Sequence, residues 1–416
     1  MRTVNATAFS RLSAPSSTAQ VNPKPLINHS MSPYVLKILS ILIEVSSLFG
    51  CVYLATATAV VIRFTRRPLS TSPIQPPASV MKPLCGQDPG LLDNLLSFAD
   101  QHYPEFQIVC GVQDPADAAI PVVERLKRER PRVPTALVVD ATRRGGNLKV
   151  ANLMNMLPSA QHDRLVMVDS DMRVPPNFLA TVTAPLEDAG VGLVTSLYRG
   201  RPADPSLPSV LGAQYINHAF LPQAVLGETL RPGQGCFGAS IGMTRQTLGA
   251  IGGFEAVADA LADDNALGSA VRRLGKRIVV SNLIIDDWIS EPSLKALFRH
   301  ELRWALTIRG VAPWGYLGSL VTHPIALALV GACLAGFGWL SLGVLAVALL
   351  GRFAMVRAVD RALGLEASPL WLVPLRDLLS FGVFIASYCT RTVAWRDRKF
   401  HVDRQGQLTL EGDSAA

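Results

Sequence analysis

The chain has 416 residues, enough for one large globular domain or two small ones, and carries a formal net charge of +7. The excess of Lys and Arg fits a protein held against an anionic membrane surface. It does not indicate nucleic-acid binding, because the sequence has no basic stripe with interleaved aromatic residues. The six cysteines show neither a CxxC pair nor metal-ligand spacing, so we expect all of them to be free thiols.

The first structured segment that we predict is a membrane helix. Residues 1–34 are rich in Ser, Thr, Asn and Pro without periodicity, and we expect a disordered tail there. The apolar run Val35–Ile62 is long enough to cross a bilayer, and it is too long and begins too far into the chain for a cleaved signal peptide. Arg63, Arg66 and Arg67 follow directly, which places the downstream side in the cytoplasm by the positive-inside rule.

Residues 79–292 alternate between strand and helix patterns and form the predicted catalytic domain. The expected strands are 79–84, 107–112, 135–139 and 165–168, and the expected helices are 90–102, 121–129 and 149–157. This alternation indicates a mostly parallel sheet covered by helices, with ligands at the carboxyl ends of the strands.

Two carboxylates follow the apolar strand 165–168 directly. Asp169 and Asp171 are separated by one residue, and in an extended chain residues i and i+2 point the same way. The pair is therefore able to hold one divalent cation together with the phosphate that the cation carries. An isolated Asp-x-Asp is also common in turns, so the interpretation depends on the α/β context around it.

Two further acidic positions have both a functional and a structural interpretation. Asp114, with Asp117 nearby, follows the strand 107–112, and the alternative is a turn aspartate before Pro115. Asp263 and Asp264 precede an apolar-periodic stretch, where the alternative is a helix N-cap. Capping does not exclude catalysis, because a carboxylate at a helix start can also face a cleft.

Two polar or flexible segments complete the predicted binding region. Lys149 and Asn152, beside the flexible Gly145 and Gly146, offer a cation and an amide to a phosphate, with a solvated loop as the alternative. The glycine-rich stretch 233–240 matches neither GxxxxGK[ST] nor GxGxxG, which argues against nucleoside triphosphatases and dinucleotide enzymes. It suits a close approach of the backbone to a substrate.

Residues 293–312 predict an amphipathic helix. Its polar side carries Lys295, Arg299, His300, Arg303 and Thr307, which favours a helix in the membrane interface over one packed in a core. On the apolar side, which includes Trp304, Glu301 is the only misfit, and Arg303 with Trp304 at the margin is still able to face an active site.

Residues 317–393 predict the C-terminal membrane segments, followed by a tail over 394–416. The apolar block 317–350 suits one long span or a hairpin broken near Gly336 and Gly338. The block 369–393 contains Arg376 and Asp377, which we interpret as a charge pair at a break or a re-entrant turn. We expect two or three crossings in total.

Several short phrases, taken together, resemble the membrane-bound family 2-like glycosyltransferases. More specifically, they resemble the ceramide glucosyltransferase group and its bacterial relative, the hopanoid-biosynthesis-associated glycosyltransferase. The phrases are MKPLCG (81–86), VQD (112–114), NLKVANL (147–153), VDSD (168–171) and HELRW (300–304). The resemblance implies a GT-A-type α/β domain, Rossmann-like and nucleotide-sugar-binding, on the cytoplasmic face, between N-terminal and C-terminal transmembrane helices.

The resemblance also implies roles in nucleotide binding. Asp114 would contact the uracil of a UDP-sugar, and Lys149 and Asn152 would lie close to the nucleotide. Asp169 and Asp171 would mark the diphosphate and its Mn²⁺ or Mg²⁺.

Three further residues take catalytic roles by the same resemblance. Asp264 would be the general base for the acceptor hydroxyl. Arg303 and Trp304 belong to a (Q/R)xxRW motif that helps hold the diphosphate and the acceptor. The chain departs from this motif at His300, which occupies the Gln/Arg position.

The expected enzyme is an inverting, metal-dependent, non-processive transferase that moves N-acetylglucosamine or glucose from a UDP-sugar to a lipid hydroxyl. We favour a hopanoid acceptor, with ceramide as the alternative, and a multi-pass location in the bacterial inner membrane. Two different functions compete with this one. The first is a processive polysaccharide synthase, expected to carry Gln or Arg in place of His300 and more spans, and the second is a non-catalytic scaffold that binds nucleotide sugars. A hydrolase is a weaker possibility because it needs a second carboxylate across the cleft.

Overall fold

The computed structural model describes residues 32–390, 392–395, 398–402 and 408–410. The tail predicted for residues 1–34 lies almost entirely outside the described residues. The tail predicted for residues 394–416 needs correction, because its described residues belong to a small antiparallel sheet. The strands of that sheet are β9 (Thr392–Trp395), β10 (Arg398–Val402) and β11 (Leu408–Leu410).

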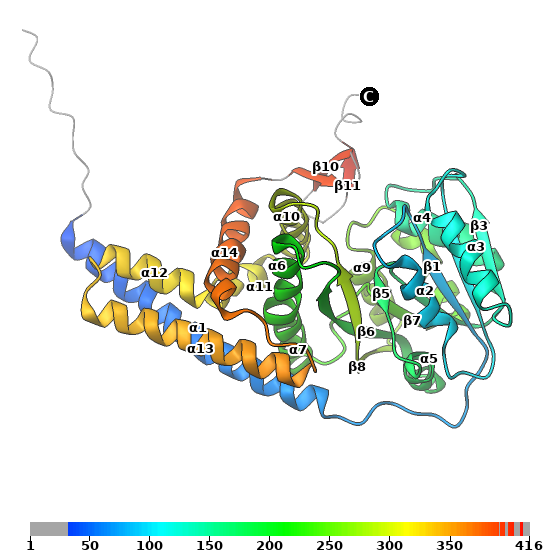
Figure 1. Ribbon diagram of the computed structural model, residues 1–416, viewed down its shortest axis with the longest axis horizontal. Coiled ribbons are helices and arrows are strands. Elements are labelled where there is room, and N and C mark those ends of the chain that lie inside the picture. Colours follow the sequence, from blue (N-terminus) through cyan, green and yellow to red (C-terminus); the bar gives the residue numbers. More distant parts are fainter. Residues whose placement is uncertain (1–31, 391, 396–397, 403–407, 411–416) are drawn as a thin grey trace, which may run out of the picture.

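An eight-stranded sheet forms the centre of the globular domain, in the order β3-β2-β1-β4-β7-β6-β8-β5 (Figure 1). The strands are β1 (Ala78–Pro83), β2 (Phe106–Val112), β3 (Thr135–Val139), β4 (Arg164–Val168), β5 (Met172–Arg173), β6 (Val191–Pro202), β7 (Ser240–Thr244) and β8 (Arg277–Ile289). The neighbours β3, β2, β1 and β4 run parallel, as the alternating pattern predicted. β7 is antiparallel to β4 and β6, and β5 is antiparallel to β8, so the whole sheet is mixed rather than mostly parallel.

Helices cover both faces of this sheet, which explains why its strands read as continuous apolar runs. In β4, Val166 and Val168 pack toward α2, α3 and α5, whereas Leu165 and Met167 pack toward α4 and α9. The predicted helices 90–102, 121–129 and 149–157 are confirmed as α2, α3 and α4, with shifted ends. The helices of this domain are α2 (Leu91–Ala99), α3 (Ala119–Glu129), α4 (Leu148–Met156), α5 (Phe178–Thr183), α6 (Leu207–Tyr215), α7 (Leu221–Leu230), α8 (Arg245–Ala250) and α9 (Asp263–Arg273).

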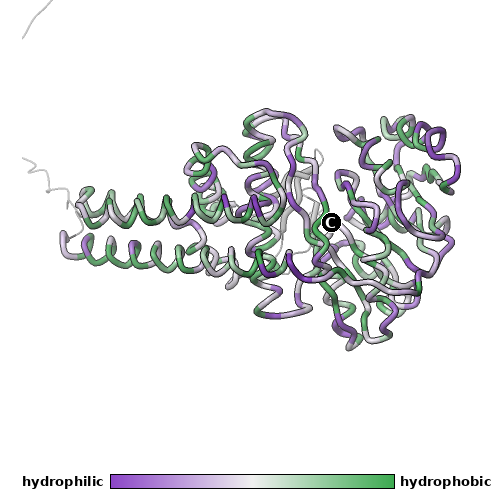
Figure 2. Tube along the Cα trace, turned by 60° about the horizontal axis from the view of Figure 1, so that its bottom comes forward, coloured by the Kyte–Doolittle hydropathy of each residue, from purple (hydrophilic) through white to green (hydrophobic). Residues whose placement is uncertain are grey.

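Three helices, α1 (Pro33–Thr65), α12 (Pro324–Leu334) and α13 (Trp339–Ala362), form a bundle that projects away from the globular domain (Figure 1). Figure 2 shows that this projection is largely hydrophobic along its length. Of the two forms predicted for residues 317–350, the hairpin is the one observed. The chain reverses between α12 and α13, where Gly336 and Phe337 adopt positive φ angles of 68° and 58°.

The outward-facing apolar surface of α1 covers only part of the predicted span. Its exposed large apolar side chains lie between Tyr34 and Val52. At 1.5 Å per residue this section is roughly 28 Å long, close to the ~30 Å hydrocarbon core of a bilayer. Farther along, Leu54, Val61 and Phe64 are buried against α7, α13 and β6. The C-terminal end of α1 therefore anchors the bundle to the globular domain.

Three more helices, α10 (Leu294–Val311), α11 (Pro313–Gly318) and α14 (Val373–Cys389), connect the bundle with the sheet. In Figure 1, α14 runs across the bundle instead of along it. The charge pair predicted for Arg376 and Asp377 is wrong, because both residues lie inside the continuous α14 and have different partners. Arg376 binds Glu301 of α10, and Asp377 lies 3.4 Å from Arg352 of α13.

By length and composition, three helical segments among the described residues suit a membrane crossing: α1, α13 and Leu370–Cys389. Residues Pro313–Thr322 and α12 form a pair bent by 69°, either a broken span or a re-entrant loop, which raises the number to as many as four. Three candidate spans are compatible with the two or three crossings expected from the sequence, whereas four would be one more than expected. All six cysteines are free thiols, also as predicted.

Candidate active site

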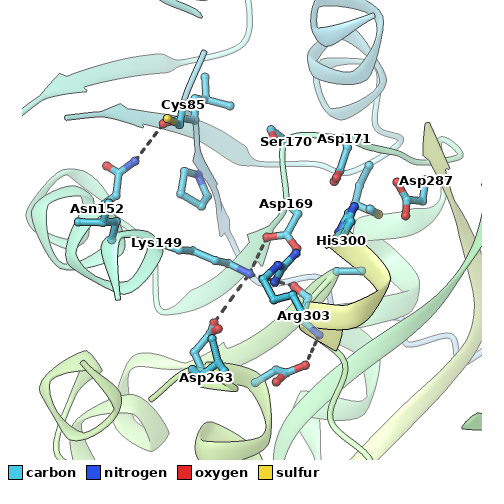
Figure 3. Close-up of a pocket in the computed structure, with 18 of the residues that line it drawn as sticks. Cys85, Lys149, Asn152, Asp169, Ser170, Asp171, Asp263, Asp287, His300 and Arg303 are labelled. Atoms are coloured by element: carbon cyan, nitrogen blue, oxygen red, sulfur yellow. Dashed lines mark hydrogen bonds and ion pairs between the residues drawn. The ribbon is translucent and has the colours of Figure 1, made fainter. Parts of the chain in front are cut away.

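A cavity of about 660 Å³ opens at the carboxyl ends of β1 and β4, between the sheet and α10 (Figure 3). This is the edge at which ligands bind in α/β sheets of this kind. All of the site residues predicted from the sequence line this one cavity: Asp114, Lys149, Asn152, Asp169, Asp171, Asp264, Arg303 and Trp304.

The acidic pair after β4 lies at the floor of the cavity, and its two members have different surroundings. Asp169 is held from two sides: its backbone N–H donates to the Ala239 carbonyl at 3.2 Å, and its Oδ1 lies 2.5 Å from Lys149 Nζ. The Oδ1 atom of Asp171 is buried and has no hydrogen-bond partner among the described residues. Between them, Ser170 Oγ donates to Asp88 Oδ2 at 2.6 Å.

Burial governs the charges around this pair. It raises the pKa of Asp171 to about 7, and repulsion from Asp169 and Asp88 acts in the same direction. Lys82 is fully buried beneath the pair, where its ammonium donates to the Asp169 carbonyl and lies 4.2 Å from the centre of the Phe98 ring. Burial lowers the pKa of Lys82 to about 8 despite the neighbouring carboxylates. The cavity floor therefore has more acid than base.

Helix α4 delivers Lys149 and braces the strands. Asn147 caps it, with Oδ1 accepting from the backbone N–H groups of Lys149 and Val150 at 3.0 and 3.2 Å. Although burial alone would lower the pKa of Lys149, the carboxylates of Asp169 and Asp263 raise it. Asn152 Nδ2 donates to the Gly111 carbonyl at 2.8 Å, so this predicted nucleotide residue ties α4 to the end of β2.

In the loop after β2, the aspartates have both a structural role, in turns, and a position at the cavity. Asp114 is exposed at the cavity and forms a turn, with Oδ1 accepting from the Ala116 N–H at 2.8 Å. Asp117 accepts from the N–H groups of Gly86 and Ala119 at 2.9 and 2.8 Å. Asp117 thus fixes the loops around the cavity, and Asp114 is the acid placed to meet a ligand.

Asp264 occupies the first turn of α9 without acting as its N-cap, because the capping position is Ala262 and no side-chain cap is present there. Its Oδ2 accepts from the Gly238 N–H at 3.0 Å. A Cβ on Gly238 would lie 3.3 Å from this oxygen, which explains a glycine at this point of the 233–240 segment. Burial, followed by repulsion from Asp263, raises the pKa of Asp264 to about 6.

The predicted amphipathic helix is α10, and its polar side is divided between two environments. Lys295 and Arg299 are exposed, whereas His300, Arg303 and Thr307 line the cavity. The apolar side packs against α6 and α14, as in the core-packed alternative. A position at the membrane surface remains a prediction.

His300, which departs from the expected motif, is built into this wall of the cavity. Its Nδ1 donates to Oε1 of Glu291 at 2.7 Å. Its ring lies 4.3 Å from that of Trp304, and Trp304 stacks in turn on Tyr215 at 5.9 Å. The ring of His300 is therefore oriented by a carboxylate on one side and an indole on the other.

Sequence reasoning missed two acids beside the predicted pair: Asp88, which accepts from Ser170 Oγ, and Asp287, which lines the cavity. Asp287 lines the cavity near the end of β8 and is only 4% exposed. The structure places Asp287 in the inward series of β8 with Leu283 and Ile285, but the sequence does not reveal this, because two apolar residues and then two aspartates follow one another there without alternation. A carboxylate in that series is unusual enough to suggest a site.

The carboxylates fit a divalent cation that arrives with a diphosphate. Among the described residues no three His, Cys, Asp or Glu side chains form a ready metal site. Mg²⁺ and similar cations, however, are commonly held by one or two carboxylates plus substrate phosphates. The Oδ1 of Asp171, which is buried and has no hydrogen-bond partner among the described residues, is an oxygen of that type.

The mixed sheet and the cavity at its strand ends define a glycosyltransferase fold of the GT-A type. A solved structure with this likeness is the mannosyltransferase of Pyrobaculum calidifontis in complex with GDP-Man and Mn²⁺. The match has a TM-score of 0.52 and 18% identity, and it covers 85% of this chain and 99% of that one.

The chain belongs to Glycosyl transferase family 21, whose family model matches residues 42–408. Ceramide glucosyltransferase 1 of Caenorhabditis elegans is 22% identical over 392 residues, which cover 88% of this chain and 82% of the relative. Ceramide glucosyltransferase 3 of the same organism is 22% identical over 352 residues, covering 80% and 74%. These relatives confirm the resemblance to the ceramide glucosyltransferase group, whereas a hopanoid specificity stays a prediction.

Proposed function

We propose that the chain transfers a hexose from a UDP-sugar to the hydroxyl of a ceramide-like membrane lipid. The observation that carries the proposal is the single cavity in which the acids after β4, the acid at the start of α9 and the basic and aromatic side chains of α10 converge. Helix α10, which lines the cavity, packs against α14, a helix of the candidate span Leu370–Cys389, so a soluble donor and an insoluble acceptor are able to meet there.

The donor side of the cavity is the sheet edge. Asp114, exposed at the end of β2, is placed to accept hydrogen bonds from a uracil ring. Lys149 is placed to offset charge on the diphosphate. Asp169 and Asp171 would hold Mn²⁺ or Mg²⁺, which stabilises the negative charge that develops on the leaving group.

On the acceptor side, Asp264 is the proposed general base. Its carboxylate takes the proton of the lipid hydroxyl while that oxygen bonds to the anomeric carbon, and the bond from this carbon to UDP breaks with its electron pair leaving on the diphosphate. A single displacement of this kind inverts the anomeric configuration and needs only one base. Arg303 supplies a fixed cation for the departing UDP, and Trp304 supplies an apolar wall for the acceptor.

The acceptor changes from the one favoured by the sequence. The relatives named above are ceramide glucosyltransferases, which favours ceramide over a hopanoid. Glucose is the corresponding donor sugar, with N-acetylglucosamine as the competitor. We place the catalytic domain on the cytoplasmic side of the bacterial inner membrane, because Arg63, Arg66 and Arg67 follow the span in α1.

The test is a transfer assay with the full chain in membranes. UDP-glucose and UDP-N-acetylglucosamine are each offered with Mn²⁺ to ceramide and to a hopanoid alcohol, and lipid products are identified by mass spectrometry. We expect glucosylceramide, lost in Asp264→Asn while UDP binding persists. Polymer without lipid product would indicate a processive synthase, and UDP-sugar binding without any product would indicate a scaffold. Either result would refute the proposal.

A further inference from the structure

Asp287 is a buried carboxylate of the cavity to which the proposed chemistry gives no role. It lies near the end of β8, is 4% exposed and lines the cavity (Figure 3). Its Oδ1 has no hydrogen-bond partner among the residues that the structure describes. A polar atom left in this state is costly unless a ligand or another group completes it. The Oδ1 of Asp287 is therefore available to bind a ligand in the cavity.

Strand pairing brings Asp287 to Asp171. The two-residue strand β5 pairs antiparallel with β8, and Met172 lies opposite Asp287 in the register. The backbone N–H of Trp288 donates to the Asp171 carbonyl at 3.2 Å, which joins the two segments. Both side chains line the same cavity. The two acids are thus held as neighbours by the backbone itself.

Each of these two carboxylates keeps a buried oxygen without a partner among the described residues, Oδ1 of Asp171 and Oδ1 of Asp287. Asp169, the other acid of the pair after β4, is different because Lys149 engages its Oδ1. The nearby Lys82 directs its ammonium to the Asp169 carbonyl and leaves both orphan oxygens without a hydrogen bond. Among the described residues, the cavity floor therefore offers two carboxyl oxygens that are available as ligands for a cation.

We propose that Asp171 and Asp287, rather than Asp171 and Asp169 alone, hold the divalent cation that accompanies the nucleotide diphosphate. This inference rests on the proposed function, because phosphate oxygens must complete the coordination. Two carboxylates plus phosphates are the donor set that small, hard cations accept. Asp169 then fixes Lys149 beside the diphosphate, and Asp287 supplies the second protein oxygen.

The experiment measures Mn²⁺ binding to the purified full chain in detergent with saturating UDP, by electron paramagnetic resonance of the free ion. Asp287→Ala removes the donor, while Asp287→Asn keeps a neutral amide oxygen. We expect the Mn²⁺ affinity of Asp287→Ala to be about 10- to 100-fold weaker or more, because the loss of an outer-sphere partner alone commonly costs about 10- to 100-fold. The affinity of Asp287→Asn should lie between those of Asp287→Ala and the wild type. Asp286→Asn is the matched control, because its carboxylate pairs with Arg201 at 2.9 Å and does not line the cavity.

Thermal unfolding without metal separates folding from binding. Both variants replace a buried carboxyl whose Oδ1 has no partner among the described residues, so we expect melting temperatures at or above that of the wild type. Wild-type Mn²⁺ affinity in a folded Asp287→Ala would overturn this inference alone. A wild-type chain that binds no Mn²⁺ with UDP would overturn the inference together with the proposed donor. Metal binding that depends on Asp287 in a chain without lipid product would support the inference and refute the acceptor.

Discussion

The buried ion pair between Glu301 and Arg376 joins the cavity to the membrane helices. Two parallel hydrogen bonds of 2.7 and 2.6 Å connect the Arg376 guanidinium of α14 to the Glu301 carboxylate of α10, and the side chains are 4% and 2% exposed. Arg376 also donates to Ser380 Oγ at 2.9 Å and to the Leu211 carbonyl of α6 at 3.3 Å. Glu301→Gln is therefore the most informative single change outside the cavity.

The expected loss of stability follows from the charge that Glu301→Gln leaves buried. A buried carboxyl that loses its partner can take up a proton, but the Arg376 guanidinium cannot lose one, so Glu301→Gln leaves a full buried charge. Breaking such a pair costs about 3–5 kcal/mol. With about 2.1 cal/mol/K per residue, the unfolding entropy of the 416-residue chain is about 0.9 kcal/mol/K. The melting temperature should fall by roughly 3–6 °C.

Activity should fall as well, because α10 carries His300, Arg303 and Trp304 into the cavity. A displacement of ~1 Å can cost about 100-fold in rate, so we expect kcat to drop by about 10- to 100-fold with donor binding little changed. Arg376→Met should be milder than Glu301→Gln, and the double variant Glu301→Met with Arg376→Met should recover most of the melting temperature. A double variant no more stable than Glu301→Gln would refute the charge argument and leave packing as the cause.

Two further predictions concern the cavity itself. Because burial raises the pKa of Asp264 to about 6 and a general base works only when deprotonated, kcat/KM should rise with pH through about 6 and level off above it. A pH-rate profile that is flat between about pH 5 and pH 8 would remove Asp264 from that role. His300→Gln, which restores a residue of the expected motif and keeps a donor toward Glu291, should retain kcat within about tenfold, whereas His300→Leu should lose about 10- to 100-fold. Equal kcat for both variants, measured in the same transfer assay, would show that the His300 side chain does not act in the reaction.

Much of the donor side could be predicted because it depends on local chain geometry. The carboxyl ends of parallel strands meet at one edge, so acids that follow β2 and β4 were expected to lie together, and Asp114 and Asp169 do. Asp171 lines the cavity too, but it does so through a turn, in which the Met172 N–H donates to the Asp169 carbonyl at 3.4 Å, and not through the extended chain that the spacing argument assumed. Two helices that begin beside that edge, α4 and α9, bring Lys149 and Asp264 to it as well. The sequence therefore predicted the composition of the cavity well.

The features of the fold and of the cavity that the sequence did not predict depend on contacts between distant segments. Asp287 joins the floor only through the antiparallel pairing of β5 with β8, and a two-residue strand leaves no periodic signal. The same limit applies to β7, whose direction makes the sheet mixed. Asn152 looked like a phosphate ligand, yet its amide is used by the Gly111 carbonyl, a partner that no local pattern reveals.

Helix α10 shows most clearly that an amphipathic pattern can predict a helix without predicting what each side of the helix contacts. A two-sided pattern separates apolar from polar positions, but α10 meets three environments: Lys295 and Arg299 lie outward, His300 and Arg303 line the cavity, and Glu301 is buried toward α14. The residue that broke the pattern forms the buried ion pair between α10 and α14, beside the apolar contacts and the hydrogen bond from Arg309 to the Ser387 carbonyl that also join these helices. Because this pair fixes the helix from behind while the motif residues face forward, the position of the bundle and the shape of the cavity are coupled through a single helix.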